Sequence, residues 1–302
     1  MKIITLTLNP AFDIHCFAEA FKPYGESVVD IISKDAGGKG VNISRALTEN
    51  GTESRAVLIV GDANGEEFLS MLKSDGLTTE AVFVNGRIRE NITLHEKDKP
   101  ETRISFRGFS CEKEILSKIK EVIGEVDGNT VITMTGSLPV GITGEDVLAL
   151  LRELKEKGAK VIIDSKSITL SELIGFKPWL IKPNRDEAES YTGKRIGSYE
   201  DALEIAKELH SAGISNVIIS LGGEGAVLSS DEGELYVKAP RIEAISTIGA
   251  GDSMIAGFIQ GEAEGETAEE KLKRAVAFGS AACLTEGTKP PRREDVERMN
   301  NE

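Results

Sequence analysis

Short apolar runs rich in β-branched residues alternate along the chain with segments of helical periodicity, and this rhythm restricts the possible folds. The order of strand followed by helix is typical of a mostly parallel sheet with helices on both faces. The sequence therefore predicts a three-layer α/β/α fold. Strands are expected at residues 3–8, 56–60, 131–134, 160–163, 179–181 and 216–220, and helices at 39–50, 66–73, 145–157, 252–262, 268–284 and 293–299.

Two stretches interrupt the rhythm, at residues 14–34 and 89–106. Both have the pattern of short antiparallel strands without an intervening helix. Because they do not fit the α/β order, we expect them to leave the main layer and form a small β lid.

The charge of the chain excludes several classes of function. The formal net charge is -14 and the sequence pI is about 4.9. Because so acidic a surface repels nucleic acids and anionic membranes, neither is an expected partner. A small anionic substrate remains possible, provided that a local basic pocket receives it.

The cysteines and the N-terminal sequence both predict a cytoplasmic location. Cys16, Cys111 and Cys283 are far apart and odd in number, which argues against a disulfide framework or a zinc site. The first residues, MKIITLTLNP, lack the long apolar stretch of a signal peptide, and no run of about 18 apolar residues predicts a membrane span.

The first candidate motif is DAGGKGVN, at residues 35–42. Glycines before a helix let backbone N–H groups approach an anion or a polar ligand, although a tight turn would need the same glycines. Lys39 adds a positive charge and Asn42 offers a donor and an acceptor. The motif is neither a Walker A loop nor G-x-G-x-x-G.

The second motif is STIGAGDSMIAGF, at residues 246–258. Gly249, Ala250 and Gly251 precede a helix expected to start near Asp252, where free N–H groups form an anion hole for phosphoryl oxygens. A carboxylate beside such a hole can accept the proton of an attacking hydroxyl. The alternative is that Asp252 only caps the helix.

Two further motifs follow predicted strands. In KPNRDE, at residues 182–187, Asn184 and Glu187 share one face if a helix begins there, and an amide with a carboxylate suits Mg²⁺, directly or through water. A plain helix cap is the alternative reading. SLGGEGA, at residues 220–226, is a glycine turn of the kind that accepts nucleotides, or a simple turn between strands.

In this order, the four motifs resemble the pfkB family of carbohydrate kinases, which has the ribokinase-like fold. The start, TLTLNPAFD, is similar to the branch containing 1-phosphofructokinase, tagatose-6-phosphate kinase and the minor 6-phosphofructokinase. The resemblance implies one kinase domain over residues 1–302, with a lid from segments at about 12–34 and 88–107. It also implies ATP and Mg²⁺ and, as in many members, a homodimer contact through the lid.

The resemblance also assigns roles by matching position. Asp252 would be the catalytic base, with the amides of Gly249, Ala250 and Gly251 as the anion hole. The remaining residues fall into three groups: Asp13, Gly38, Lys39 and Asn42 for the sugar; Lys182, Asn184, Ser220, Gly222 and Gly225 for ATP; and Asn184 and Glu187 for Mg²⁺, through water.

Arginines of the second lid segment predict a phosphorylated sugar. Arg89, Arg103 and Arg107 are placed to hold a second phosphate, and arginine suits bidentate phosphate recognition. The first expectation is therefore phosphorylation of fructose 1-phosphate to fructose 1,6-bisphosphate, with tagatose 6-phosphate and fructose 6-phosphate as alternatives. Kinases of an unphosphorylated sugar or nucleoside, and a non-catalytic sugar or nucleotide sensor, are the competing hypotheses.

Overall fold

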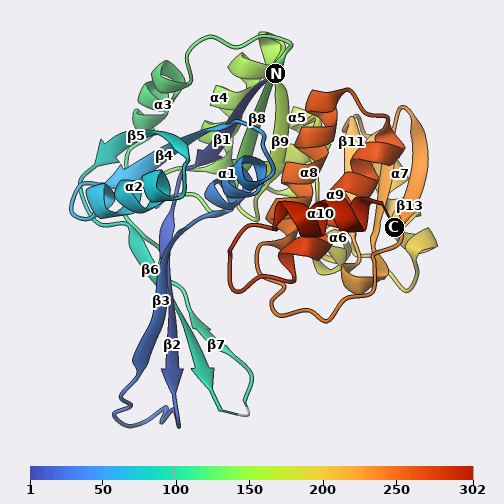
Figure 1. Ribbon diagram of the computed structural model, residues 1–302. Coiled ribbons are helices and arrows are strands. Elements are labelled where there is room, and N and C mark those ends of the chain that lie inside the picture. Colours follow the sequence, from blue (N-terminus) through green and yellow to red (C-terminus); the bar gives the residue numbers. More distant parts are fainter. Residues whose placement is uncertain (98, 302) are drawn as a thin grey trace.

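The computed structural model of the protein describes residues 1–97 and 99–301 and contains two sheets (Figure 1). Asp98, inside the second predicted lid segment, lies outside the described residues. The larger sheet has nine strands in the order β13-β12-β11-β10-β9-β8-β1-β4-β5, of which β12 and β13 are antiparallel to their neighbours. Its strands are β1 (Lys2–Thr7), β4 (Arg55–Gly61), β5 (Thr78–Val84), β8 (Thr130–Thr135), β9 (Lys160–Asp164), β10 (Leu180–Ile181), β11 (Asn216–Ser220), β12 (Ala226–Ser230) and β13 (Gly233–Val237).

Ten α-helices in the described part of the chain cover this sheet (Figure 1). They are α1 (Lys39–Glu49), α2 (Gly65–Ser74), α3 (Ile115–Ile123), α4 (Gly144–Glu156), α5 (Leu170–Phe176), α6 (Arg185–Thr192), α7 (Tyr199–Ser211), α8 (Ala250–Glu264), α9 (Ala268–Ala282) and α10 (Arg293–Asn300). None of them has the length and apolar character needed to cross a membrane.

Alternating residues of the central strands belong to different apolar clusters. In β1, Ile3 belongs to the apolar cluster that contains residues of α8, α9 and α10, whereas Ile4 and Leu6 belong to the cluster that contains residues of α2 to α5 and α7. In β8, Val131 and Ile132 divide in the same way. A strand buried on both faces reads as a continuous apolar run, which is the signal that the sequence carried. The predicted three-layer α/β/α architecture is confirmed.

The predicted elements lie within one or two residues of the observed ones at most of their ends, and several elements were missed. The sequence reading did not name β5, α3, α5, α7, β12 or β13. Four of the helix starts carry an N-cap hydroxyl paired with an acidic residue three positions later, in α4, α5, α7 and α9. This capping box was a usable signal for α5 and α7.

The two interruptions of the α/β rhythm form a separate four-stranded sheet in the order β3-β2-β6-β7 (Figure 1). It contains β2 (Ala11–Ala18), β3 (Asp30–Gly37), β6 (Arg89–Glu96) and β7 (Thr102–Ile104). Each pair of strands close in sequence is antiparallel, as predicted, but the two pairs are joined by a parallel contact between β2 and β6. The small sheet projects from one end of the larger one (Figure 1).

Candidate active site

The main cavity lies where the strand order of the large sheet reverses. From β1 the chain continues outward through β4 and β5, whereas β8 to β11 extend on the other side of β1. Ligands of open α/β sheets bind at such a switch point, beyond the carboxyl ends of the strands. The cavity there has a volume of about 1180 Å³ and, apart from Arg107, is lined by every residue that the sequence assigned to catalysis, substrate, ATP or metal.

Helix α8 points its start into this cavity. Gly249 is the N-cap in a left-handed conformation (φ 79°), so the helix begins at Ala250, two residues before the predicted start. The amides of Ala250 and Ser253 donate to backbone carbonyls, whereas those of Gly251 and Asp252 have no backbone acceptor within the described residues. These two amides are the donors of an anion hole at the positive end of the helix.

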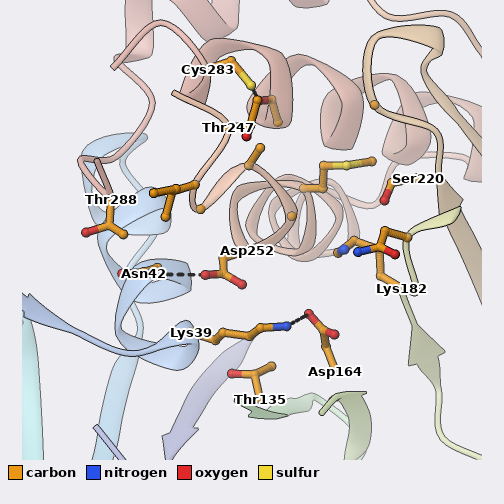
Figure 2. Close-up of a pocket in the computed structure, with 18 of the residues that line it drawn as sticks. Lys39, Asn42, Thr135, Asp164, Lys182, Ser220, Thr247, Asp252, Cys283 and Thr288 are labelled. Carbon is orange, nitrogen blue, oxygen red and sulfur yellow. Dashed lines mark hydrogen bonds and ion pairs between the residues drawn. The ribbon is translucent and has the colours of Figure 1, made fainter. Parts of the chain in front are cut away.

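Asp252 lies in the first turn of α8 rather than at its cap. The residue is 6% exposed, and its Oδ2 accepts a hydrogen bond of 2.9 Å from Nδ2 of Asn42 (Figure 2). Burial raises the pKa of Asp252 to about 6, assisted by Asp164 and opposed mainly by the positive charge of Lys39. A carboxylate with that pKa is ionised at neutral pH and is a stronger base than an ordinary aspartate.

Lys182 supplies a cation beside the anion hole. The side chain is buried (4% exposed), and a Cβ on Gly251 would lie only 2.9 Å from its Nζ. Within the described residues its ammonium group has no carboxylate or carbonyl partner at bonding distance. A buried ammonium without a counterion is costly, so this position favours binding of an anion such as a phosphate chain.

Lys39, which the resemblance assigned to the sugar, is paired with a carboxylate. It is the first residue of α1, and its Nζ lies 3.0 Å from Oδ2 of Asp164 at the end of β9 (Figure 2). Burial lowers the pKa of Lys39, but attraction by Asp164, Asp252 and Glu187 outweighs it, so the pKa lies above its ordinary value. Asp164 was missed by the sequence reading, although it ends a predicted strand.

Asp13 anchors the part of the cavity next to the small sheet. It accepts a hydrogen bond of 3.1 Å from Nδ2 of Asn91, and its Oδ1 lies 3.5 Å from Nη2 of Arg103. A Cβ on Gly37 would lie 2.1 Å from Oδ2 of Asp13, so the glycine makes room for this carboxylate. Three strands of the small sheet, β2, β6 and β7, thus contribute one polar group each.

The predicted arginine cluster divides into three environments. Arg103 and Arg89 line the cavity, whereas Arg107 does not. The Arg89 guanidinium donates to the backbone carbonyls of Asn9, Pro10 and Phe106. It therefore fixes the base of the small sheet, and Arg103 is the arginine with more free donors toward a ligand.

Asn184 and Glu187 form the cap of α6. Glu187 N donates to Oδ1 of Asn184 (2.9 Å), and Asn184 N donates to Oε2 of Glu187 (3.1 Å). The other carboxylate oxygen of Glu187 lies 3.5 Å from Nζ of the exposed Lys166. The helix-cap reading is confirmed, and both residues also line the cavity, whereas the Mg²⁺ reading stays a prediction.

The glycine turn at residues 220–226 connects β11 to the antiparallel β12. Ser220 ends β11 and forms a parallel bridge with Asn184, which brings the turn to the α6 cap. Gly225 has φ 109°, and a Cβ there would lie 2.0 Å from the carbonyl oxygen of Val237. Gly222 also has positive φ (61°), with open space beside it on the cavity side.

In the described part of the chain, four cavity-lining residues carry a buried side-chain oxygen without a hydrogen-bond partner: Thr7, Asn9, Asn42 and Thr135. An unsatisfied buried oxygen costs about 1–3 kcal/mol, so a polar ligand or bound water that reached them would be favoured. Thr7, Asn9 and Thr135 were missed by the sequence reading. They lie at or just after the carboxyl ends of β1 and β8, and that position was the available signal.

Comparison with known proteins agrees with this geometry. Residues 8–295 match the model of the pfkB family of carbohydrate kinases. The 1-phosphofructokinase of Escherichia coli K12 is 32% identical over 285 residues, covering 93% of this chain and 90% of the relative. Structures of Escherichia coli phosphofructokinase-2 in complex with potassium and with fructose-6-phosphate give TM-scores of 0.93 and 0.91 at 28% and 27% identity, covering 99% of this chain and 98% of that one.

The ribokinase of Thermotoga maritima, 22% identical with a TM-score of 0.81 over 100% of both chains, shares the fold. The fold is thus that of the ribokinase-like α/β class. The chain belongs to the pfkB family of carbohydrate kinases, and it is an ATP-dependent sugar-phosphate kinase.

Proposed function

We propose that this kinase transfers the γ-phosphoryl group of ATP to a ketohexose monophosphate, with fructose 1-phosphate as the first candidate. Tagatose 6-phosphate is the second candidate. Fructose 6-phosphate is kept as the third because the solved relatives include a complex with it. The observation that carries the proposal is Asp252, a buried carboxylate with raised pKa beside the open amides of α8, in a cavity lined both by the small sheet (Asp13, Arg103) and by the glycine turn at residues 220–225.

The proposed reaction uses the two sides of the cavity in sequence. Asp13 and Asn42 hold hydroxyl groups of the sugar, and the turn at residues 220–225 receives the nucleotide. The sugar hydroxyl oxygen attacks the γ-phosphorus while its proton moves to Asp252. The bond to the β–γ bridging oxygen breaks and ADP leaves with that electron pair. The amides of Gly251 and Asp252 and the Lys182 ammonium stabilise the developing negative charge.

The proposed Mg²⁺ site fits a hydrated ion rather than a directly ligated one. No group of three or more metal-ligating acidic, histidine or cysteine side chains occurs within the described residues. Oε2 of Glu187 and Oδ1 of Asn184 are used by the α6 cap, so Oε1 of Glu187, which lies 3.5 Å from the exposed Lys166 ammonium, is the oxygen that would accept from a metal-bound water. When bound with ATP, the ion would neutralise phosphate oxygens.

Glu187→Gln tests this assignment. Glutamine preserves the capping box, so the variant is expected to fold normally while losing the charge that attracts the hydrated ion. The Mg²⁺ concentration for half-maximal rate should rise by about 10–100-fold, as for other groups that act on a metal through its ligands. An unchanged magnesium titration would contradict the assignment.

Arg103→Ala tests recognition of the substrate phosphate. Removing a charge-assisted bond of about 1.5–3 kcal/mol should raise KM for the sugar phosphate by about tenfold or more, with little change in KM for ATP. Arg107→Ala is the matched control, because this exposed arginine lies outside the cavity. Equal KM changes in both variants would refute the role of Arg103.

A substrate screen separates the candidate functions. Initial rates with ATP should be measured for fructose 1-phosphate, tagatose 6-phosphate, fructose 6-phosphate, free fructose, ribose and a nucleoside. We expect the highest kcat/KM for a ketohexose phosphate. A higher value for an unphosphorylated acceptor would overturn the proposal, and the absence of turnover with every acceptor would favour a sensor.

We further propose that the small sheet is the lid of a single kinase domain and closes over the bound sugar. Exclusion of water by a closing lid limits wasteful hydrolysis of ATP. Hydrogen exchange in β6 and β7 should slow when sugar phosphate and nucleotide are bound together. Unchanged exchange with both ligands present would count against closure.

The small sheet and the chain beside it expose five apolar side chains, Val29, Ile31, Ile32, Ile104 and Phe106, each at least 40% exposed. Large exposed apolar areas mark interaction sites. We propose that a second copy of this chain covers them, giving a dimer that sedimentation velocity would detect.

A cytoplasmic location stays the prediction made from the cysteines, all three of which are free thiols.

A further inference from the structure

The position of Lys39 does not match a residue that only holds the sugar. Its side chain begins at the first turn of α1, on the sugar side, and passes below the Asp252 carboxylate to end at Asp164 (Figure 2). The Nζ to Oδ2 distance is 3.0 Å, and the side chain of Asp164 is only 8% exposed. The ammonium is therefore held at the floor of the cavity.

Three carboxylates attract the Lys39 ammonium: Asp164, Asp252, and Glu187 of the α6 cap. Asp164 is the ion-pair partner at 3.0 Å, and Asp252 lies above the Lys39 side chain (Figure 2). In the proposed reaction Asp252 takes the proton of the attacking hydroxyl, so Lys39 lies next to the place where the phosphoryl group is transferred.

A cation at this place offsets part of the negative charge of the site. Asp164, Asp252 and Glu187 would repel the phosphate chain, and Lys182, beside the start of α8, is the other lysine that lines the cavity. During phosphoryl transfer the negative charge is spread over the equatorial oxygens of the moving group. A preorganised cation aimed at those oxygens stabilises the transition state more than the ground state.

We infer that Lys39 is a catalytic residue that donates a hydrogen bond to the transferred phosphoryl group, and that Asp164 is a positioning residue that holds the Lys39 ammonium until that group arrives. The inference rests on the proposed phosphoryl transfer. Lys39 keeps its protons throughout, because the hydroxyl proton goes to Asp252 and the electron pair of the broken bond leaves with ADP. The role differs from sugar binding, since it acts on kcat rather than on KM.

The test measures the kinetics of Lys39→Met and of wild type with the sugar phosphate that wild type uses best. Methionine keeps the length of the side chain and removes its charge. This choice of substrate separates the inference from the proposed function, which fails only if wild type prefers an unphosphorylated acceptor or is inactive. We expect kcat to fall by roughly 10²-fold or more, as when an oxyanion donor is removed. KM for the sugar phosphate should change by less than about threefold, and so should the Kd for ATP measured by calorimetry. Loss of one hydrogen bond to a charged group would change an affinity by considerably more.

Asp164→Asn is the second variant and has a readout that a merely structural role would not change. Without Asp164, Lys39 is free to approach Asp252, so the acidic limb of the kcat/KM profile should move to lower pH. In Lys39→Met the same limb should move to higher pH, because the cation that opposes the raised pKa of Asp252 is gone.

Lys273→Met is the matched control, because Lys273 is also paired with a carboxylate (Glu269, 2.7 Å) but lies outside the cavity. Its kinetics should equal those of wild type. An increase in sugar-phosphate KM with kcat unchanged in Lys39→Met would return Lys39 to the sugar-binding role and overturn the inference. If Lys39→Met does not fold, the pH profile of Asp164→Asn decides. The inference is then overturned if the acidic limb of its kcat/KM profile lies at the same pH as in wild type.

Discussion

Asp252→Asn should leave a folded protein that binds ATP but turns over sugar phosphate roughly 10²-fold or more slowly, because the variant has no base for the hydroxyl proton. The carboxamide preserves the size of the side chain and can still accept the hydrogen bond from Asn42. Stopped-flow or steady-state rates, together with an ATP Kd from calorimetry, measure the two properties separately. Near-normal turnover in the folded variant would remove Asp252 from the mechanism.

The pH dependence of the wild-type rate is a second test of Asp252 as the base. Asp252 must be ionised to act as a base, and burial raises its pKa to about 6. The value of kcat/KM should therefore fall as the pH decreases through about 6. This acidic limb reports the pKa of Asp252 in the free enzyme. An ordinary aspartate would give a limb about two pH units lower.

The raised pKa of Asp252 also lowers the stability of the fold at neutral pH. Between pH of about 4 and about 6, the unfolded chain has lost the Asp252 proton while the native protein retains it, so the free energy of unfolding decreases as pH rises. A shift of about two units corresponds to about 3 kcal/mol above pH 6. Asp252→Asn removes this penalty, so its Tm at pH 7 should exceed that of wild type, and a lower Tm would contradict the electrostatic account.

Lys182→Met should weaken ATP binding by about 10–100-fold, the equivalent of a lost charge-assisted bond of about 1.5–3 kcal/mol. The reason is the place of Lys182, buried beside Gly251 with no carboxylate partner within the described residues. Methionine has a similar length and fits an apolar environment, so the variant should also be at least as stable as wild type. Calorimetric titration with ATP and thermal unfolding measure the two effects.

Lys207→Met is the control for this experiment, since Lys207 pairs with Glu234 (3.3 Å) on the surface outside the cavity. ATP affinity should be unchanged in the control. If Lys182→Met bound ATP as tightly as wild type, Lys182 would not be a ligand of the phosphate chain.

The sequence was sufficient for the layers of the fold and for the motifs near helix starts, because both depend on local order. Strand-helix alternation defines the sheet, and glycines before α1 and α8 mark where the backbone must leave room for a ligand. The same local signals misplaced the start of α8, since Gly249 in a left-handed conformation caps the helix without a side-chain bond.

What the sequence could not provide was the pairing of distant charges. Asp164 is the last residue of an ordinary buried strand, and only the fold brings its carboxylate to Lys39, 125 residues earlier. The surroundings of Arg89 were hidden for the same reason, because its acceptors are backbone carbonyls that carry no sequence signature. Residue type identified these side chains as charged, and the tertiary contacts determine what each charge does.

The parallel contact between β2 and β6 has a consequence for the order of folding. Paired residues of the two strands, such as Asp13 and Asn91, are 78 positions apart, and the chain between them builds α1, β4, α2 and β5. Closing so long a loop has an entropic cost that contacts within the small sheet repay only slightly, since its buried apolar cluster contains just Cys16, Ala18 and Leu94 among the described residues. We therefore expect the main sheet to form first and to act as the template on which the two hairpins meet, and the same hairpins to separate first in sub-global unfolding.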